Sequence, residues 1–382
     1  MEIIDKVLAL RKSLTASFVQ KDAEVSAVLA GLFSGEPVFL VGPPGTAKTA
    51  IIERVAKSIN ANYFYYLLTR FTEPEEILGP IDVIALRQGQ YKRITEYRLP
   101  WAHIAFLDEI FKASSAIRNI LLDIILNKRF MNGNGYVKLN ILGFYTASNE
   151  ISTDSEDQAF YDRLTIRVFV KNIGMDMWDE LINAGISLEE HNEPEQFMTI
   201  DEIKELQKVV NIRFSNIRGN QKLKNKYISA LSALKSHGIE LSDRRKIKVL
   251  KVAAALSVVF MDADITLDSL ADALRFTAVH TEEDIATVEK VIIQEKLSSF
   301  AVQMQKLQTV IAELRRFTEQ AKSGGLDELK GLTAVYKKTL EVIETLPKNP
   351  RFMPMIRELK NVVIDAKNVI DRKKKEIFGD VE

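Results

Sequence analysis

Residues 41–50 read VGPPGTAKTA and nearly match the phosphate-binding pattern G-x-x-x-x-G-K-[ST]. In such a loop, backbone N–H groups and the start of the following helix bind phosphate oxygens. The lysine reaches the outer phosphates and the final hydroxyl holds Mg²⁺. An apolar run precedes the loop and a helical pattern follows it, as this site requires. The expected phosphate-binding residues are Gly42, Pro43, Pro44, Gly45, Thr46, Ala47, Lys48 and Thr49.

One position departs from the pattern, because Ala47 stands where the last glycine is expected. Alanine disfavours positive φ, whereas glycine adopts it freely. If Ala47 begins the helix with helical φ, the alanine costs little and still offers its N–H group. If the position needs positive φ, the loop is strained. Stereochemistry therefore predicts a tolerable alanine only where its backbone is helical.

A second chemical signal is IAFLDEI, a buried strand that delivers Asp108 and Glu109 at its carboxyl end. Ligands of open α/β sheets bind at that edge. Asp108 would complete the coordination of Mg²⁺, and Glu109 could orient and activate the attacking water. An exposed acidic pair after a strand is the alternative, and the phosphate-binding loop earlier in the chain favours the catalytic interpretation.

Two further polar residues lie at strand ends. Asn149 closes FYTASN and could hold the attacking water or touch the terminal phosphate, although asparagine is also a common turn residue. Arg163, in YDR, could form a surface ion pair with Asp162 or act as an arginine finger on transferred phosphate. The residue types alone leave both alternatives open.

Alternating strands and helices in the first 170 residues predict an α/β domain with a mostly parallel sheet. Asn-Gly pairs in residues 129–140 favour a hairpin. The expected strands are 37–41, 62–68, 103–110, 140–149 and 164–170, and helices are expected at 48–58 and 115–129.

After about residue 174 the patterns are helical. Thr199 and Glu202 form a capping box, and Ser242 caps a later helix. We expect an α/β nucleotide-binding core over 1–173, an all-α lid over 174–280 and a helical region over 281–382. Breaks at 323–325 and 347–350 divide the last region into about three long helices.

Composition excludes several classes of function. The 382 residues contain 52 basic and 52 acidic side chains, so a global polycation for nucleic acid is not supported. No cysteine is present, which excludes disulfides, thiolate metal sites and cysteine nucleophiles. The four histidines lack metal-ligand spacing. No signal core or membrane span is recognisable, and a cytoplasmic protein is expected.

The motifs GPPGTAKT, FLDEI, TASN and YDR, in this order, resemble those of AAA+ ATPases. The stretch LLTRFTEPEEILGPIDVIALRQGQYKR (67–93), with ASNE and SDRR (242–245), resembles the MoxR group and most closely its RavA branch. The resemblance covers roughly residues 1–280. It implies a five-stranded, mostly parallel sheet flanked by helices, followed by an all-α lid. That branch normally carries alanine at the position of Ala47, which implies an intact site.

The resemblance also implies roles. Lys48 and Thr49 would bind phosphate and Mg²⁺, Asp108 and Glu109 would be the Walker B pair, and Asn149 would be sensor 1. Arg163 would be the finger acting on a neighbouring subunit's ATP, and Arg244 would be sensor 2, reaching the nucleotide of its own subunit. Members form homo-oligomeric rings, typically hexamers. They remodel protein substrates together with a von Willebrand factor A-domain partner, and the insert (79–96) and the hairpin (129–140) would face the pore or rim.

Two other functions remain open at this stage. A nucleic-acid motor is suggested by Arg244, Lys248 and Lys251 on one helical face, with Arg245 and Lys246 nearby, although a solvated face is the better interpretation. A non-catalytic scaffold would use the helical tail as an interaction arm. The complete set of motif carboxylates argues against a scaffold. The compact module that RavA-like proteins insert in this tail has no match here.

Overall fold

The structure is a computed structural model that describes residues 2–152, 154–190, 193–344 and 350–378. It divides into two compact units, one ending at Leu297 and one beginning at Ser298. The first unit extends past the expected boundary at 281, because helix α13 (Asp284–Gln294) packs against α10 (Gln221–Ser236) and α12 (Leu267–Thr277). The first unit therefore contains both the expected core and the expected lid.

A five-stranded sheet in the order β2-β3-β6-β1-β7 forms the centre of the first unit, and all its strands are parallel. The predicted α/β core is thus confirmed, with each strand slightly shorter than expected. All residues of β1 are buried, as its continuous apolar run predicts for a strand covered on both faces. The strands are β1 (Val38–Val41), β2 (Tyr63–Leu67), β3 (Ile104–Asp108), β6 (Gly143–Ser148) and β7 (Ile166–Phe169).

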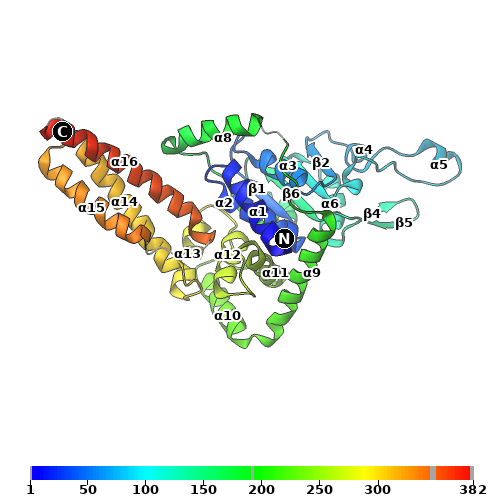
Figure 1. Cartoon of the computed structure of the whole chain (residues 1–382). Helices are drawn as coiled ribbons and strands as arrows, with labels where there is room; N and C mark the ends of the chain where they lie inside the picture. Colours follow the sequence, from blue (N-terminus) through cyan, green and yellow to red (C-terminus); the bar gives the residue numbers. More distant parts are fainter. Residues whose placement is uncertain (1, 153, 191–192, 345–349, 379–382) are drawn as a thin grey trace. The chain divides into compact units, whose positions relative to one another are not determined.

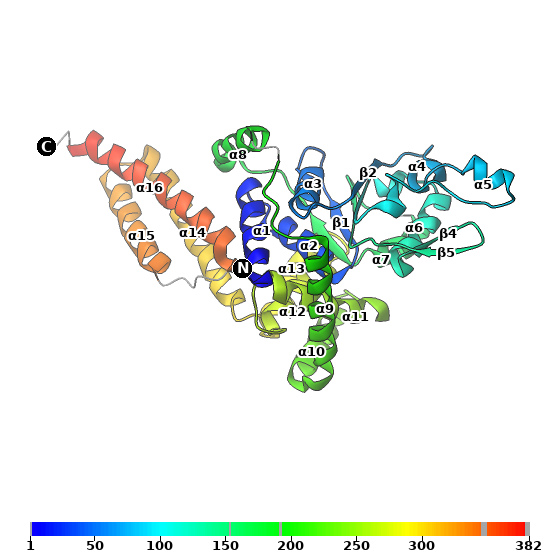
Figure 2. The same ribbon diagram turned by 45° about the vertical axis from the view of Figure 1, so that its right-hand side comes forward.

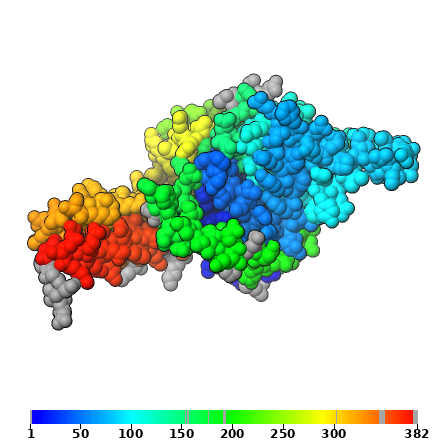
Figure 3. Space-filling model, turned by 90° about the horizontal axis from the view of Figure 1, so that it is seen from above, coloured from blue at the N-terminus to red at the C-terminus, as the bar shows by residue number. Residues whose placement is uncertain are grey.

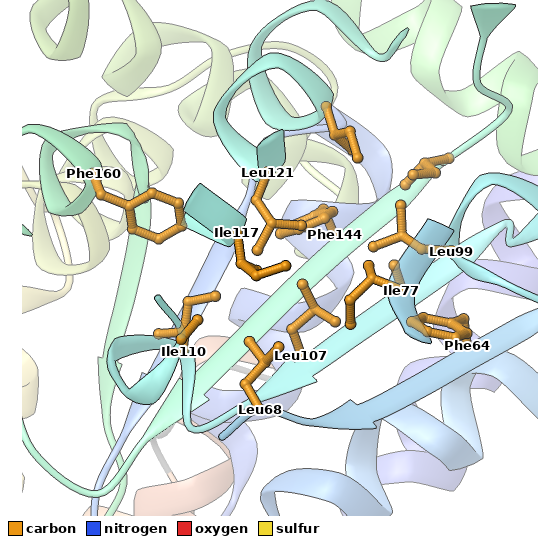
Figure 4. Close-up of a cluster of buried hydrophobic side chains, with 14 of the residues drawn as sticks. Phe64, Leu68, Ile77, Leu99, Leu107, Ile110, Ile117, Leu121, Phe144 and Phe160 are labelled. Carbon is orange, nitrogen blue, oxygen red and sulfur yellow. The ribbon is translucent and has the colours of Figure 1, made fainter. Parts of the chain in front are cut away.

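One face of the sheet packs against helices α4 (Pro74–Leu78), α6 (Ser115–Asn127) and α7 (Ser155–Arg163). Figure 4 shows this apolar cluster, in which Leu107 and Phe144 from the sheet meet Ile117 and Leu121 from α6. Because these side chains are all but removed from water, their burial is a main stabilising contribution to the core. The cluster holds the carboxyl end of β3 in place.

Helix α2 (Asp22–Ser34) covers the opposite face and is buried over almost its whole length. Its Val28 carbonyl accepts a hydrogen bond of 3.0 Å from the Tyr145 hydroxyl in β6. Lid helices α9 (Ile200–Asn216) and α11 (Asp243–Val259) pack against α2 in turn. The predicted Thr199–Glu202 capping box and Ser242 cap are both present. Helices α9 and α11 of the lid therefore reach the back of the sheet through α2.

Two excursions leave the core on the same side. The first contains α5 (Val83–Arg87), and the second is the antiparallel hairpin of β4 (Arg129–Asn132) and β5 (Gly135–Lys138). Figure 1 and Figure 2 show both extending from one edge, and Figure 3 shows the α5 segment (light blue) as a protrusion. They touch, because the Arg93 N–H donates to the Asn132 side-chain oxygen at 2.8 Å. The predicted hairpin is confirmed.

The remaining elements of the first unit are helical. Helix α1 (Ile3–Ser17) precedes α2, and α3 (Lys48–Ser58) follows the phosphate-binding loop. Helix α8 (Trp178–Glu190) follows β7 in the chain and precedes α9. Short 3₁₀ helices are η1 (Leu99–Trp101), η2 (Ile110–Lys112), η3 (Met175–Met177) and η4 (Ile217–Gly219).

The second unit contains three long helices, as predicted: α14 (Ala301–Ser323), α15 (Leu326–Glu344) and α16 (Met353–Phe378), with η5 (Pro350–Phe352) before the last. They share one apolar core that includes Leu314, Leu332 and Leu359. Antiparallel helices joined by short connections pack in this way. Across the described ranges, no helix is both long enough and apolar enough to cross a membrane.

Candidate functional site

The phosphate-binding loop follows β1 directly and leads into α3. Gly42 needs to be glycine because a Cβ there would lie 2.1 Å from the carbonyl oxygen of Val170, at the end of β7. Gly45 has φ of 76°, which favours glycine. The Thr46 hydroxyl donates to the Pro43 carbonyl at 2.9 Å and closes the turn. The loop is thus shaped by backbone geometry and close packing rather than by large side chains.

The loop offers unused hydrogen-bond donors. Within the described part of the chain, the backbone N–H groups of Gly45, Thr46 and Ala47 donate to no other group. Because α3 begins at Lys48, its first N–H groups also lack partners inside the helix. A cluster of such donors at a helix N-terminus binds anions. The loop therefore fits the phosphates of a nucleotide.

Ala47 has φ of 66° and ψ of 17°, in the left-handed region. The condition set by stereochemistry, a helical backbone at this position, is not met. An L-residue in this conformation costs roughly 1–2 kcal/mol, because Cβ approaches the following carbonyl oxygen. The loop has this form between Gly42, which packs closely against Val170 on one side, and α3, which begins directly on the other. Strain at a ligand-binding loop is common.

We expect Ala47→Gly to stabilise the protein by about 0.5–1 kcal/mol, because relief of the strain exceeds the added freedom of the unfolded chain. Denaturant or thermal unfolding measures the change. Ala50→Gly is the matched control, since Ala50 lies inside α3. The control should lose roughly 1 kcal/mol. A loss of stability in Ala47→Gly similar to that in the control would contradict the left-handed backbone.

Lys48 is buried and turns its ammonium group onto the loop, where it donates to the carbonyls of Gly42 at 2.7 Å and Pro43 at 2.9 Å. Burial lowers its pKa, and the carboxylates of Asp108 and Glu109 oppose this shift. Helix α3, which begins at Lys48, also contacts β3, which ends at Asp108. The structure thus brings together the two motifs that the sequence separates.

The acidic pair lies at the carboxyl end of β3. Burial raises the pKa of Asp108, and its Oδ1 accepts the Glu109 N–H at 2.9 Å. Glu109 has φ of 55°, and its Oε1 accepts a hydrogen bond of 2.7 Å from the Asn149 amide. Strands β3 and β6 are parallel neighbours, so the residues that follow them, Glu109 and Asn149, lie side by side. The side chains of Thr49 and Asp108 are the oxygen ligands that would suit Mg²⁺.

Sequence reasoning missed a cavity beside the loop. It has a volume of about 440 Å³ and is bounded by Gly45, Thr46, Ala47 and Ala50 on one side. Apolar side chains from the α1–α2 connection and from α8 form the other walls, which fits a planar, weakly polar group such as a nucleobase. The apolar spacing of α8 was the available signal. The apolar lining includes Phe18, Val19, Ile173, Trp178, Leu181 and Leu188.

Arg163 lies at the opposite edge of the sheet from the loop. It ends α7, just before β7, and β7 runs parallel to β1 with Val38 beside Ile166 and Val41 beside Phe169. The strand runs five residue steps from Thr165, near Arg163, to Val170, near the loop (170 − 165). At 3.3 Å per residue, the two ends are about 17 Å apart. An arginine side chain spans roughly 7 Å. Arg163 therefore cannot reach the loop of its own chain.

Arg244 lies at the same edge as Arg163. The Ser242 hydroxyl that caps α11 donates to both carboxylate oxygens of Asp162, at 3.0 and 3.1 Å. This contact fixes the first turn of α11 against the end of α7, and the exposed Arg244 belongs to that turn. Arg244 is thus carried beside the end of α7, and its expected reach to the nucleotide of its own subunit stays a prediction.

Other basic residues of α11 have partners within the same chain. Lys248 and Lys251 both bind the buried carboxylate of Glu36, at 2.7 and 3.1 Å. Lys246 pairs with Asp243 at 2.8 Å, and Arg245 is buried. The basic pattern that suggested a nucleic-acid motor is therefore largely part of the contact between lid and core. Within the described ranges, no cluster of three or more acidic or histidine side chains could hold a metal ion by itself.

Comparisons with known proteins agree with this architecture. Residues 5–208 match the model of the MoxR domain found in MoxR–vWA–beta-propeller ternary systems. An uncharacterized protein of Methanocaldococcus jannaschii is 31% identical over 363 residues, which cover 94% of this chain and 92% of the relative. The chaperone MoxR1 of Mycobacterium tuberculosis is 30% identical over 115 residues, or 30% of each chain.

A solved structure has the same fold. It is a candidate ATPase from Cytophaga hutchinsonii, with a TM-score of 0.61 and 14% sequence identity, and the match covers 76% of this chain and 94% of that one. At this identity the likeness concerns the fold: an α/β AAA+ core with a helical lid.

Proposed function

Because this chain belongs to the MoxR family of AAA+ proteins, we propose that it binds ATP and hydrolyses it to ADP and phosphate. The observation that carries the proposal is the convergence of three separate segments at one edge of the sheet. The loop with unused N–H groups, the acidic pair after β3 and Asn149 after β6 all lie there. This is the edge at which open α/β sheets bind ligands.

Each residue then has a physical role. Lys48 exchanges its loop carbonyls for phosphate oxygens, and the loop N–H groups bind the remaining oxygens. Mg²⁺, held by Thr49 and Asp108, would neutralise charge on the phosphates. Glu109 accepts a proton from the attacking water, and Asn149 keeps that carboxylate oriented through their hydrogen bond. The cavity beside the loop receives the base.

The site is completed by a second copy of the chain. Arg163 lies at the end of the sheet opposite the loop, too far to serve its own nucleotide, and Arg244 is carried beside it. In a head-to-tail assembly, that end faces the loop of the next copy. Arg163 then neutralises charge on the transferred phosphate of the neighbour, and Arg244 approaches the same nucleotide. A closed ring, typically a hexamer in this family, repeats this contact.

The two excursions from the core are the proposed contact with protein substrates. The α5 segment exposes Val83, Ile84 and Leu86, and the hairpin exposes Met131 and Tyr136. Exposed apolar side chains gathered on projecting segments are typical of protein-binding surfaces. Coupling ATP turnover to these segments gives a chaperone-like remodeller. The von Willebrand factor A-domain protein of the ternary systems in which this MoxR domain occurs is the proposed partner.

The proposed activity is tested by comparing nucleotide binding and ATP turnover in wild type and in Lys48→Ala. Trp178 lines the cavity and is half-exposed, so its fluorescence should change when ATP fills the site. Trp101→Phe leaves Trp178 as the single reporter, because the chain has two tryptophans. Wild type should bind Mg·ATP and release phosphate, and Lys48→Ala should lose turnover. Equal phosphate release by the two proteins would refute the assignment of the site.

A further inference from the structure

The segment that carries Arg163 is held by two buried arginines. Arg245 of α11 donates to the carbonyls of Asp162 at 3.1 Å, Leu164 at 3.0 Å and Thr165 at 3.1 Å, and also to that of Thr277. Arg167 of β7 donates to the carbonyls of Tyr161 at 2.7 Å and Leu164 at 3.1 Å. Four of the five carbonyls of residues 161–165 therefore accept from a guanidinium group.

Both arginines are almost fully buried, with 1% of each exposed. Burial lowers the pKa of Arg245 to about 9 and that of Arg167 to about 10. Among the residues that the structure describes, neither guanidinium pairs with a carboxylate. Both are bound by backbone carbonyls, and Arg167 also contacts Nδ1 of His280 at 2.9 Å and lies 3.7 Å from the Tyr161 ring centroid. Leaving a buried charge costs much unless such partners surround it. These contacts are therefore specific to the planar, forked guanidinium.

These contacts join the segment of residues 161–165, which carries Arg163, to the lid. Arg245 belongs to α11 and also binds Thr277 at the end of α12, while Arg167 binds Val279 at 3.1 Å. The N-terminal cap of α11 is fixed by Asp162, the residue before Arg163. The backbone segments that carry Arg163 and Arg244, one from the core and one from the lid, are consequently linked by hydrogen bonds.

We infer that Arg245 is a positioning residue, which fixes Arg163 for action on the nucleotide of the neighbouring copy. The inference rests on the proposed function of Arg163. Arg245 contacts neither the loop nor the acidic pair in its own chain, so its role runs through the backbone of 162–165. Lysine would keep the charge but cannot bind several carbonyls at fixed angles. Helix α11 and Arg163 then keep a fixed position relative to each other when neighbouring copies move.

Arg245→Lys tests the inference. Because a small misplacement of a catalytic group is costly, we expect kcat for ATP to fall on the order of 10- to 100-fold with little change in KM. Arg213→Lys is the matched control: Arg213 lies in the same lid and binds Ser257 at 2.7 Å and the Asp262 carbonyl at 2.9 Å, away from the finger. Thermal unfolding of both variants measures structural damage, and the control should keep its kcat.

Mixed assemblies separate a misplaced finger from a damaged nucleotide site. Lys48→Ala subunits lack a working site but keep Arg163 and Arg245. Mixed with them, Arg245→Lys subunits should regain turnover, because their intact sites receive a correctly held finger. No recovery would overturn the positioning role of Arg245. Arg163→Ala mixed with Lys48→Ala is the reference pair, and its failure to recover would instead overturn action across subunits.

Discussion

Glu109→Gln should lower kcat for ATP by about 10²–10⁴-fold while nucleotide binding persists, because the amide cannot accept the proton of the attacking water. The change is nearly isosteric, so the hydrogen bond from Asn149 at 2.7 Å can be kept. The loop and Lys48, which carry phosphate binding, are untouched. Single-turnover phosphate release measures the chemical step, and Trp178 fluorescence measures binding.

Glu150→Gln is the matched control for this prediction. Glu150 follows Asn149, is exposed, and loses the same charge at the same edge of the sheet. The control should retain the wild-type rate. A wild-type rate in Glu109→Gln would remove Glu109 from the mechanism, and an equal loss in both variants would mean that general electrostatics at this edge, rather than proton acceptance, sets the rate.

Arg163→Ala should reduce kcat by about 10³-fold or more, the range that an arginine finger contributes. KM should change little, because the guanidinium acts mainly on charge that develops in the transition state. In this chain the side chain donates to the Ala159 carbonyl within its own helix, so assembly must release or extend it. Steady-state ATP turnover at saturating nucleotide measures the effect.

Arg218→Ala removes an exposed arginine of the lid and serves as the control. It should leave kcat unchanged. A loss in Arg163→Ala that is seen in KM alone would mean that the arginine only assists nucleotide binding. A sedimentation comparison of wild type and Arg163→Ala distinguishes loss of the finger from loss of assembly.

Much of the site could be predicted from the sequence, since its chemistry is local. The loop, the buried run ending in Asp108 and the strand before Asn149 each carry a short pattern that fixes both an element and a side chain at its end. Parallel strands then bring those ends to one edge, as observed. The capping residues of α9 and α11 were equally local signals.

What depends on distant packing could not be predicted. The left-handed backbone of Ala47 belongs to a loop that packs through Gly42 against Val170, which is 128 residues away (170 − 42). The cavity forms only because α8 lies near the loop. Arg245 belongs to a run of charged residues in α11, and such a run gives no sign that one of its members is buried. The branch within the family that the motifs resemble, RavA, likewise stays a prediction.

The central claim is that the ATP site is completed by a neighbouring copy of the chain. The rate of phosphate release per subunit, measured on wild type across a dilution series with sedimentation at each concentration, tests it most directly. The rate per subunit should rise with the fraction of assembled protein and fall toward the Arg163→Ala rate when the protein is monomeric. A rate per subunit that stays constant while the assembly dissociates would contradict the claim.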